Sequence, residues 1–263
     1  MPHARQFAQS IKSGLTLPWW LVKEMPPINA DFEQRVVSLP QHAHWRPTQL
    51  LGMELRVLEY FPGIRPRLSA QLRLAPTSSP ATLGENPDLE IMMQRGELES
   101  EMGVYPAGMY LRLPVTDDCH LQQLKLHCAS IDDELTKGTL TQALLYLAAG
   151  QMLTTDTEQR RINTDDESRW LPGPVKGTEV LPLHGHSTSN IMLIRWTSDV
   201  KFKPRLDPMG EEVLVLNGLL HDELGNYPAG SWIRNPIAAW QSWSAKAGTL
   251  VYYKNGHFAA PID

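Results

Sequence analysis

Closely spaced histidines are the first residues of this chain that could bind a transition metal. His42 and His44 are separated by one residue, as are His184 and His186, so each pair would share a face if it lay in a strand. Imidazole nitrogen is a good ligand for Zn, Fe, Cu and Ni. The two pairs stand at non-equivalent places in the internal repeat described below. We therefore interpret them as exposed or loop histidines.

A second set of possible metal ligands combines thiols with imidazoles, namely Cys119, His120, His127 and Cys128. On one strand, Cys119 and Cys128 would stand about 30 Å apart at roughly 3.3 Å per residue. They could share a metal only across a tight turn, and the residues between them include no Gly or Pro. Buried free thiols are the favoured interpretation.

Carboxylates alternate at Glu97, Glu99 and Glu101, which places all three on one face of a strand. A solvated sheet edge is the favoured interpretation, with a surface for a cation or a basic partner as the alternative. The sequence has no Gly-x-Ser-x-Gly nucleophile elbow, no P-loop and no Gly-x-Gly-x-x-Gly after a strand. Hydrolase and nucleotide-binding classes are therefore disfavoured.

The elements that position these residues come from a duplication. Residues 96–114 (GELESEMGVYPAGMYLRLP) and 218–236 (GLLHDELGNYPAGSWIRNP) are identical at ten of nineteen positions. Trp45 and Trp170, each followed two residues later by proline, open the two units. Repeats longer than 100 residues are whole domains rather than solenoid units.

Secondary-structure signals inside the repeats are those of short strands. Apolar runs such as 191–194, 213–216 and 249–253 are separated by Gly, Pro, Asn and Asp, which predicts an all-β barrel or sandwich. The apolar residues of 139–149 recur at the helical period, so we predict a short helix between the domains.

We divide the chain accordingly into four segments. These are an N-terminal arm over 1–27, a first domain over 28–130, a helix and linker over 131–164 and a second domain over 165–263. The apolar stretch within the arm is too short for a membrane span, which needs about 20 residues. We expect it to pack on the body of this protein or on that of a neighbouring copy.

The repeated string, with its Gly-x-Tyr-Pro-Ala-Gly-x-aromatic-x-Arg-x-Pro pattern, resembles the ChrR-like cupins, the type of the C-terminal domain in ChrR anti-sigma factors. The resemblance covers both repeats and implies a double-stranded β-helix (jelly-roll) barrel in each half, a bicupin. The helical sigma-binding domain of that family, with its His/Cys zinc site, has no counterpart among the residues before the first repeat. A sigma factor is thus a partner by family analogy alone.

Cupins of this type hold a metal with two histidines, a glutamate and a third histidine. In the second repeat the resemblance places Arg205, Asp207, Glu211 and Gln241 at these positions. Arginine cannot lose its proton to coordinate a cation. We expect a polar ligand pocket instead, in which Arg205 bridges Asp207 and Glu211, and which Trp240 and Trp243 help to shape.

The corresponding positions in the first repeat are Leu83, Glu85, Leu89 and Cys119, with His120 as an alternative ligand. Two leucines replace ligands there, so we expect the drier pocket in this half. No metal is expected in either domain. A divalent Zn, Mn, Fe or Ni ion is the less favoured alternative.

Composition sets the outer limits on function. The chain has 263 residues, of which 24 are basic and 29 acidic, and no basic block that would suggest direct nucleic-acid binding. Two cysteines are too few for a secreted disulfide framework, so we expect a soluble, cytoplasmic protein without membrane association.

Three functional classes remain. A regulatory or small-ligand-binding bicupin is favoured, a metal-dependent cupin enzyme of the dioxygenase or isomerase type is the alternative, and a duplicated structural scaffold is the third. The sequence leaves open whether the chain forms a homodimer. Within the repeats, we further expect Arg112 and Arg234 to have matching structural roles, with Glu101 and Glu223 as their partners.

Overall fold

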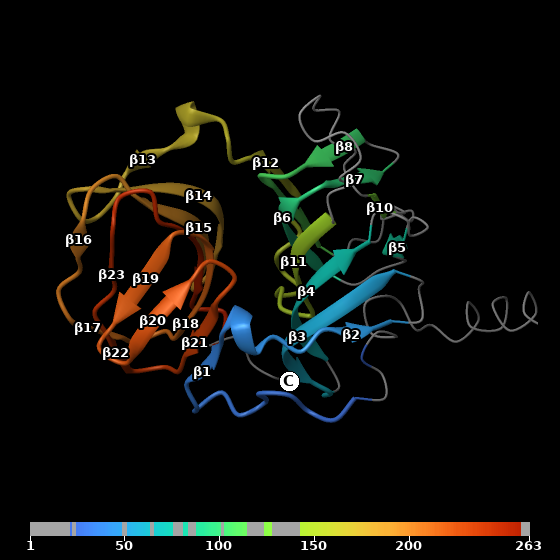
Figure 1. Ribbon diagram of the computed structural model, residues 1–263, viewed down its shortest axis with the longest axis horizontal. Helices are drawn as coiled ribbons and strands as arrows, with labels where there is room; N and C mark the ends of the chain where they lie inside the picture. The colour runs from blue at the N-terminus through green and yellow to red at the C-terminus, as the bar shows by residue number, and fades with distance from the viewer. Residues whose placement is uncertain are drawn as a thin grey trace, which may run out of the picture.

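The computed structural model contains two β-barrels side by side, one from each half of the chain (Figure 1). Two 3-10 segments, Pro40–His42 and Glu167–Arg169, are the helical pieces among the described residues. The structure describes residues 22, 25–48, 52–63, 66–75, 81–83, 88–100, 103–114, 124–127 and 143–258.

The first barrel combines a seven-stranded antiparallel sheet, in the order β12-β9-β6-β11-β4-β3-β2, with a four-stranded sheet, in the order β5-β10-β7-β8. Its strands in chain order are β2 (Arg46–Pro47), β3 (Met53–Phe61), β4 (Arg67–Leu74), β5 (Ala81–Leu83), β6 (Leu89–Arg95), β7 (Glu97–Ser100), β8 (Gly103–Pro106), β9 (Met109–Leu113), β10 (Leu124–His127), β11 (Ala143–Ala149) and β12 (Arg160–Asn163).

The second barrel has a seven-stranded sheet in the order β1-β21-β18-β24-β15-β14-β13, a four-stranded sheet in the order β16-β23-β19-β20, and the two-stranded ribbon β17-β22. Its strands are β1 (Val36–Ser38), β13 (Leu171–Pro172), β14 (Thr178–His186), β15 (Ser189–Trp196), β16 (Val200–Lys201), β17 (Arg205–Asp207), β18 (Glu211–Asn217), β19 (Leu219–Asp222), β20 (Gly225–Pro228), β21 (Trp232–Asn235), β22 (Ala239–Gln241), β23 (Ser244–Ala245) and β24 (Leu250–Asn255).

The two large sheets have the same strand order once β2 to β13, β3 to β14, β4 to β15, β11 to β24, β6 to β18 and β9 to β21 are matched. Tyr105 and Tyr227 are buried at equivalent places in β8 and β20. The turn glycines of the repeated string, Gly108 and Gly230, have φ of 83° and 87°, a region that other residues rarely adopt. The duplicated, all-β cupin architecture expected from the sequence is confirmed.

The first strand of each repeat completes the sheet of the other repeat. β1 precedes the first barrel in the chain but pairs with β21 of the second, where Val37 lies opposite Ile233. β12 precedes the second barrel but pairs with β9 of the first, where Arg161 lies opposite Leu111. Figure 1 shows β1 beside β21, far from the other blue strands. We refer to this arrangement as the strand exchange.

The helix predicted within residues 139–149 is wrong. Ala143–Ala149 is β11, a central strand that pairs with both β4 and β6. Six of its seven side chains are buried because one face lies in the first barrel and the other faces the second. A strand covered on both faces is apolar throughout, and a helical period can be read into such a run. β11 and β12 also show that segment 131–164 contributes strands to the first sheet.

Three apolar clusters hold the molecule together. Alternate residues of β4, β6 and β11 fill the first barrel, joined by Val22 from the predicted arm. A second cluster, which includes Trp243 and Tyr253, fills the second barrel. A third lies between the barrels, with Tyr146 from one half and Tyr252 from the other, ring centroids 5.2 Å apart. The halves thus share a core instead of being joined by a bare linker.

Buried ion pairs accompany this shared core. Arg234, fully buried, bonds Glu59 of the first half at 2.5 Å, and Arg112 bonds Asp156 at 2.5 Å. Both arginines are thus covered and paired, and the carboxylate that pairs with Arg234 is not Glu223. Glu223 instead pairs with Ser242 and Lys201 near the surface, and Glu101 lies outside the described residues. The predicted pairing of Arg234 with Glu223 is wrong because the strands bring residues of other elements to the arginines.

Candidate functional site

A set of polar side chains gathers where the β17–β22 ribbon meets β18, β21 and β24 in the second barrel. We name it the second-barrel cluster. Its members are Arg205, Asp207, Glu211, Asn235, Gln241, Trp243 and Tyr253. Pairing of Arg205 with Gln241 in the ribbon puts these two side chains on one face. The structure thus brings together five of the six residues predicted for the ligand pocket, all except Trp240.

Glu211 lies at the centre of the second-barrel cluster and is fully buried. Its Oε1 accepts hydrogen bonds from Asn235 Nδ2 at 2.8 Å and Trp243 Nε1 at 2.9 Å. Its Oε2 has no hydrogen-bond partner among the described residues. Burial raises the pKa of Glu211 to about 7, because the loss of hydration outweighs the bond from Asn235. Glu211 Oε1 thus accepts two hydrogen bonds, whereas Oε2 accepts none from the described residues and lies 4.0 Å from Arg205 Nη2.

Gln241 adds two more unpaired atoms to the second-barrel cluster. Its side chain is 4% exposed, and neither Oε1 nor Nε2 finds a partner in the part of the chain that the structure describes. Buried polar atoms are nearly always hydrogen-bonded to protein or to water. Glu211 and Gln241 together thus have three buried polar atoms without a hydrogen bond among the described residues.

Arg205 is the exposed member of the second-barrel cluster, with 49% of its side chain accessible. Its Nη2 lies 3.7 Å from Asp207 Oδ2, 4.0 Å from Glu211 Oε2 and 3.2 Å from Tyr253 Oη. Tyr253 in turn donates to Asp207 Oδ2 at 3.3 Å. The guanidinium thus lies near both carboxylates at distances longer than a direct fork of hydrogen bonds.

The two tryptophans predicted beside the pocket differ in burial. Trp243 is buried and bonds Glu211. Trp240 alternates with Gln241 along β22, so it points to the other face of the ribbon, next to Leu206, and is 73% exposed. Only Trp243 shapes the interior.

The first barrel replaces this polar set with leucines. Strand matching pairs Glu211, Asn235 and Tyr253 with Leu89, Leu113 and Leu147. Leu89 and Leu147 are in the apolar cluster of the first barrel, and Leu113 packs against it. The other first-repeat positions, Glu85, Cys119 and His120, lie outside the described residues, and of Leu83 only the strand is described. The fold therefore does not require the polar residues of the second barrel.

The second-barrel cluster does not fit the metal that cupins commonly hold. It offers two carboxylates and an amide oxygen, but Arg205, a permanent cation, lies within 4.0 Å of Glu211. In the described residues no group of three His, Cys, Asp or Glu side chains is arranged to bind a metal ion. A guanidinium supplies the positive charge that a metal would otherwise supply.

The histidine pairs lie away from the second-barrel cluster. His184 is buried in β14, not in a loop, and its Nε2 lies 2.9 Å from Asp156 Oδ2. His186 is partly exposed and lies within reach of Thr155. His42 ends the first 3-10 segment, and His44 follows it. The interpretation as exposed or loop residues is wrong for His184, because it belongs to the buried ionic network between the barrels.

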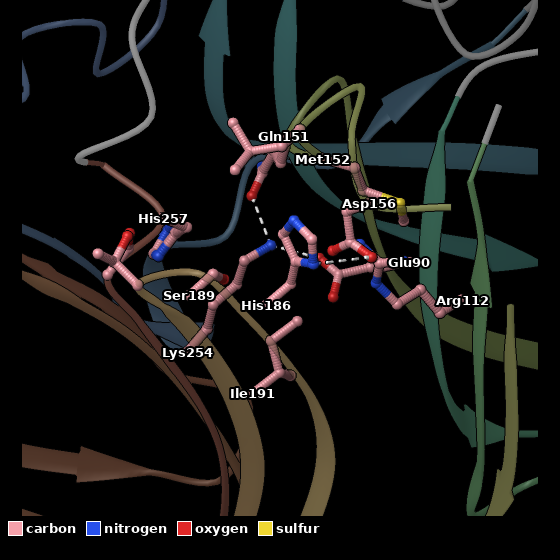
Figure 2. A pocket seen from close by; sticks show the side chains of 13 residues that line it. Glu90, Arg112, Gln151, Met152, Asp156, His186, Ser189, Ile191, Lys254 and His257 are labelled. Atoms are coloured by element: carbon pink, nitrogen blue, oxygen red, sulfur yellow. Dashed lines mark hydrogen bonds and ion pairs between the residues drawn. The ribbon is translucent and has the colours of Figure 1, made fainter. Parts of the chain in front are cut away.

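A small cavity of about 20 Å³, room for about one water, lies between the barrels (Figure 2). Lys254 points into it and pairs with Glu90, while Asp156 and Arg112 pair on the opposite wall. Charges of both signs are matched there, so the cavity belongs to the packing of the two halves.

Sequence reasoning did not find two members of the second-barrel cluster, Asn235 and Tyr253. Asn235 stands in the repeated string next to Arg234, where the first copy has Leu113. The available signal was a polar residue in the second copy where the first has leucine, which is one of the nine positions at which the two strings differ.

Comparison with known proteins finds a family match in the second half of the chain. Residues 158–259 match the family model of the ChrR cupin-like domain, so this part of the chain is similar to that domain. No curated protein matches the chain in sequence. The matched residues include every member of the second-barrel cluster, and the strand order of the second barrel recurs in the first.

Solved structures share the tandem fold at low sequence identity. A salicylate 1,2-dioxygenase from Pseudoaminobacter salicylatoxidans, in adducts with gentisate, is 10% identical with a TM-score of 0.58 over 97% of this chain and 90% of that one. A bacterial pirin from Escherichia coli, in complex with nickel(II), is 11% identical with a TM-score of 0.56 over 84% and 98%. A cupin 2 conserved barrel domain protein from Leptotrichia buccalis is 9% identical with a TM-score of 0.52 over 80% and 91%. At these identities the likeness concerns the fold. No helix in the described residues is long and apolar enough to cross a membrane.

Proposed function

We propose that the second barrel binds a small polar ligand without a metal, and that the chain is a ligand-binding regulatory protein related to the ChrR anti-sigma factors. The observation that carries the proposal is the set of three buried polar atoms without a hydrogen bond in the described part of the chain, Glu211 Oε2 and the two amide atoms of Gln241, in the cluster that includes Arg205. The first barrel, with the same fold, has the buried Leu89 at the position that matches Glu211.

Energetics support a ligand at this place. A buried polar atom without a hydrogen bond destabilises the folded state by about 1–3 kcal/mol. Glu211 Oε2 and both amide atoms of Gln241 are in this position. Proteins retain such groups at functional sites, where a bound molecule completes the hydrogen bonds. The ligand must offer both a donor and an acceptor, as a hydroxyl or an amide does.

The regulatory part of the proposal rests on the ChrR cupin-like match over 158–259. A sigma factor is the partner that the family suggests. This part of the proposal is based on analogy with proteins of the same fold. A cytoplasmic location belongs to the same analogy.

A cupin enzyme of the dioxygenase or isomerase type is the second candidate. The observation in its favour is the shared fold with a salicylate 1,2-dioxygenase. This candidate requires a divalent metal in a barrel, which Arg205 opposes in the second barrel.

Elemental analysis and ligand extraction test the proposal on the purified full-length chain. We expect less than about 0.1 equivalent of Zn, Mn, Fe or Ni per chain by mass spectrometry. Denaturing wild-type protein should release a small polar molecule that is absent from the Glu211→Leu variant, which copies the first barrel. A variant of the first barrel, Leu89→Met, serves as the control and should retain the molecule.

About one equivalent of metal per chain, lost in the Glu211→Ala variant, would favour the enzyme instead. Equal extracts from wild type and Glu211→Leu would remove the second-barrel cluster as a ligand site.

A further inference from the structure

Arg35 links the first repeat to the site in the second barrel. It lies immediately before β1, the strand that pairs with β21 in the strand exchange. Its Nε donates to Asn235 Oδ1 at 2.7 Å, and its Nη2 donates to Asp222 Oδ2 at 2.5 Å and Tyr227 Oη at 2.9 Å. Three partners therefore fix the guanidinium from different sides.

These contacts determine which way the Asn235 amide points. Its oxygen accepts from Arg35, which leaves its Nδ2 to donate to Glu211 Oε1 at 2.8 Å. With the amide reversed, an NH₂ group would face the guanidinium and a carbonyl oxygen would face the carboxylate. Both contacts would be repulsive, because each would bring like partial charges together.

The orientation of Asn235 in turn sets the orientation of Glu211. Asn235 and Trp243 both donate to Oε1, so the other oxygen, Oε2, is left toward Arg205 and unpaired. We propose that Arg35 is a positioning residue for the ligand site, which holds the Asn235 amide so that Glu211 presents Oε2. The inference rests on the proposed function of the second barrel.

The matching place in the first barrel has no such chain of contacts. The register of β12 on β9 corresponds to that of β1 on β21. Gln159 therefore occupies the position that corresponds to Arg35, and Leu113 the position that corresponds to Asn235. Closure of a barrel by the exchanged strand therefore does not depend on this arginine. Arg35 is found at the barrel that contains the polar cluster, and glutamine takes its position at the barrel that lacks this cluster.

The test follows the ionisation of Glu211 through the indole N–H of Trp243, which contacts it directly. The ¹⁵N–¹H resonance, assigned by its loss in Trp243→Phe, should titrate in the wild type and not in Glu211→Gln. In Arg35→Met we expect the midpoint to rise by at least about 0.5 pH unit, because a hydrogen bond to the charged carboxylate is lost. The other charged or titratable groups around Glu211, which all variants keep, are Arg205, Asp207 and Tyr253.

Two further variants distinguish the effect of the positive charge of Arg35 from its effect on the orientation of the Asn235 amide. Arg35→Lys keeps the charge without the fork of donors, so it should also raise the midpoint. In the Asn235→Leu background, Arg35→Met should cause no further rise. Circular dichroism checks that each variant is folded, and Arg35→Lys remains informative where Arg35→Met is not.

An unchanged midpoint in both Arg35 variants, or an equal rise with and without Asn235, would overturn the positioning role. Neither outcome involves a ligand. If the extraction experiment fails while the midpoint still depends on Arg35 through Asn235, the proposed function is wrong and the positioning of Glu211 stands.

Discussion

Two buried glutamates in this chain have opposite electrostatic surroundings. Burial works against the charged form of Glu90, but the Lys254 ammonium pairs with it and holds the pKa of Glu90 below its usual value. Glu211 has no cation at hydrogen-bond distance, so burial raises its pKa to about 7. The first carboxylate stabilises the joint between the barrels, whereas the second weakens the fold at neutral pH. Such a weakness is typical of a functional site.

Replacement of Glu211 by glutamine should stabilise the protein in a pH-dependent way. The pKa of Glu211 is raised from 4.5 to about 7 in the folded protein. The contribution of protonated Glu211 to the stability of the wild type is therefore complete below pH 4.5 and is lost as the pH rises through 7. We expect Glu211→Gln to match the wild type near pH 4.5 and to exceed it by roughly 2–4 kcal/mol at pH 8. Urea unfolding at both pH values measures this difference.

The exposed Glu167, paired with Arg195, supplies the control, since Glu167→Gln should not reproduce the gain at high pH. A Glu211→Gln variant less stable than the wild type at pH 8 would contradict the prediction.

The sequence supplied most of the site at this scale. The resemblance to the ChrR-like cupins, counted from the repeated string, selected Arg205, Asp207, Glu211 and Gln241, which the structure brings to one end of the second barrel. Tyr253 could not be predicted, since its approach to Asp207 depends on β24 crossing the barrel from the far end of the chain.

At the scale of elements, alternation and turn residues predicted strands well wherever one face of a strand is polar. The prediction failed at β11, where both faces are buried and the residue pattern no longer distinguishes a strand from a helix. The strand exchange also could not be predicted from the sequence. β1 and β12 have matching roles, but no local residue type specifies which barrel an edge strand joins.

Removal of β1 should therefore destabilise the second barrel, although β1 is far from it in sequence. A chain that begins at residue 43 loses β1 and Arg35, and exposes the edge of β21. We expect its melting temperature to fall by about 5–10 °C, equivalent to roughly 2–3 kcal/mol. Proteolysis within residues 211–258 should become faster.

A chain that begins at residue 22 retains β1 and should behave like the full-length protein. Equal proteolysis of the two shortened chains would mean that β1 contributes little to the second barrel.

At the scale of the whole molecule, the barrels meet through buried charges as well as apolar residues. His257 is among them, fully buried and 3.3 Å from Glu212. Burial, assisted by nearby cations, lowers the pKa of His257 well below 6.5, so the imidazole is neutral. The charged groups that face it are Arg67, Glu90, Glu212, Arg234 and Lys254.

Acid should consequently destabilise the interface between the two barrels. The folded state resists protonation of His257. The contribution of neutral His257 to the free energy of unfolding is therefore complete above pH 6.5 and is lost as the pH falls below that value. We expect the wild type to lose roughly 2 kcal/mol more than His257→Gln between pH 7 and pH 5. Thermal unfolding at the two pH values measures the difference.

His221, in the β19–β20 hairpin, offers the control, and His221→Gln should follow the wild type. Parallel losses in wild type and His257→Gln would exclude His257 as the acid-sensitive group.

The strand exchange also bears on how the duplication arose. A chain with a single repeat and the same exchange would close its barrel only with a second copy, so its folding would be bimolecular and dependent on concentration. Joining two repeats in one chain converts that encounter into an intramolecular one, at an effective concentration near the millimolar range. We therefore expect the melting temperature of this protein to be the same over a hundredfold range of dilution. Once the joint is covalent, the two copies are also free to diverge, one toward an apolar support and the other toward a polar site.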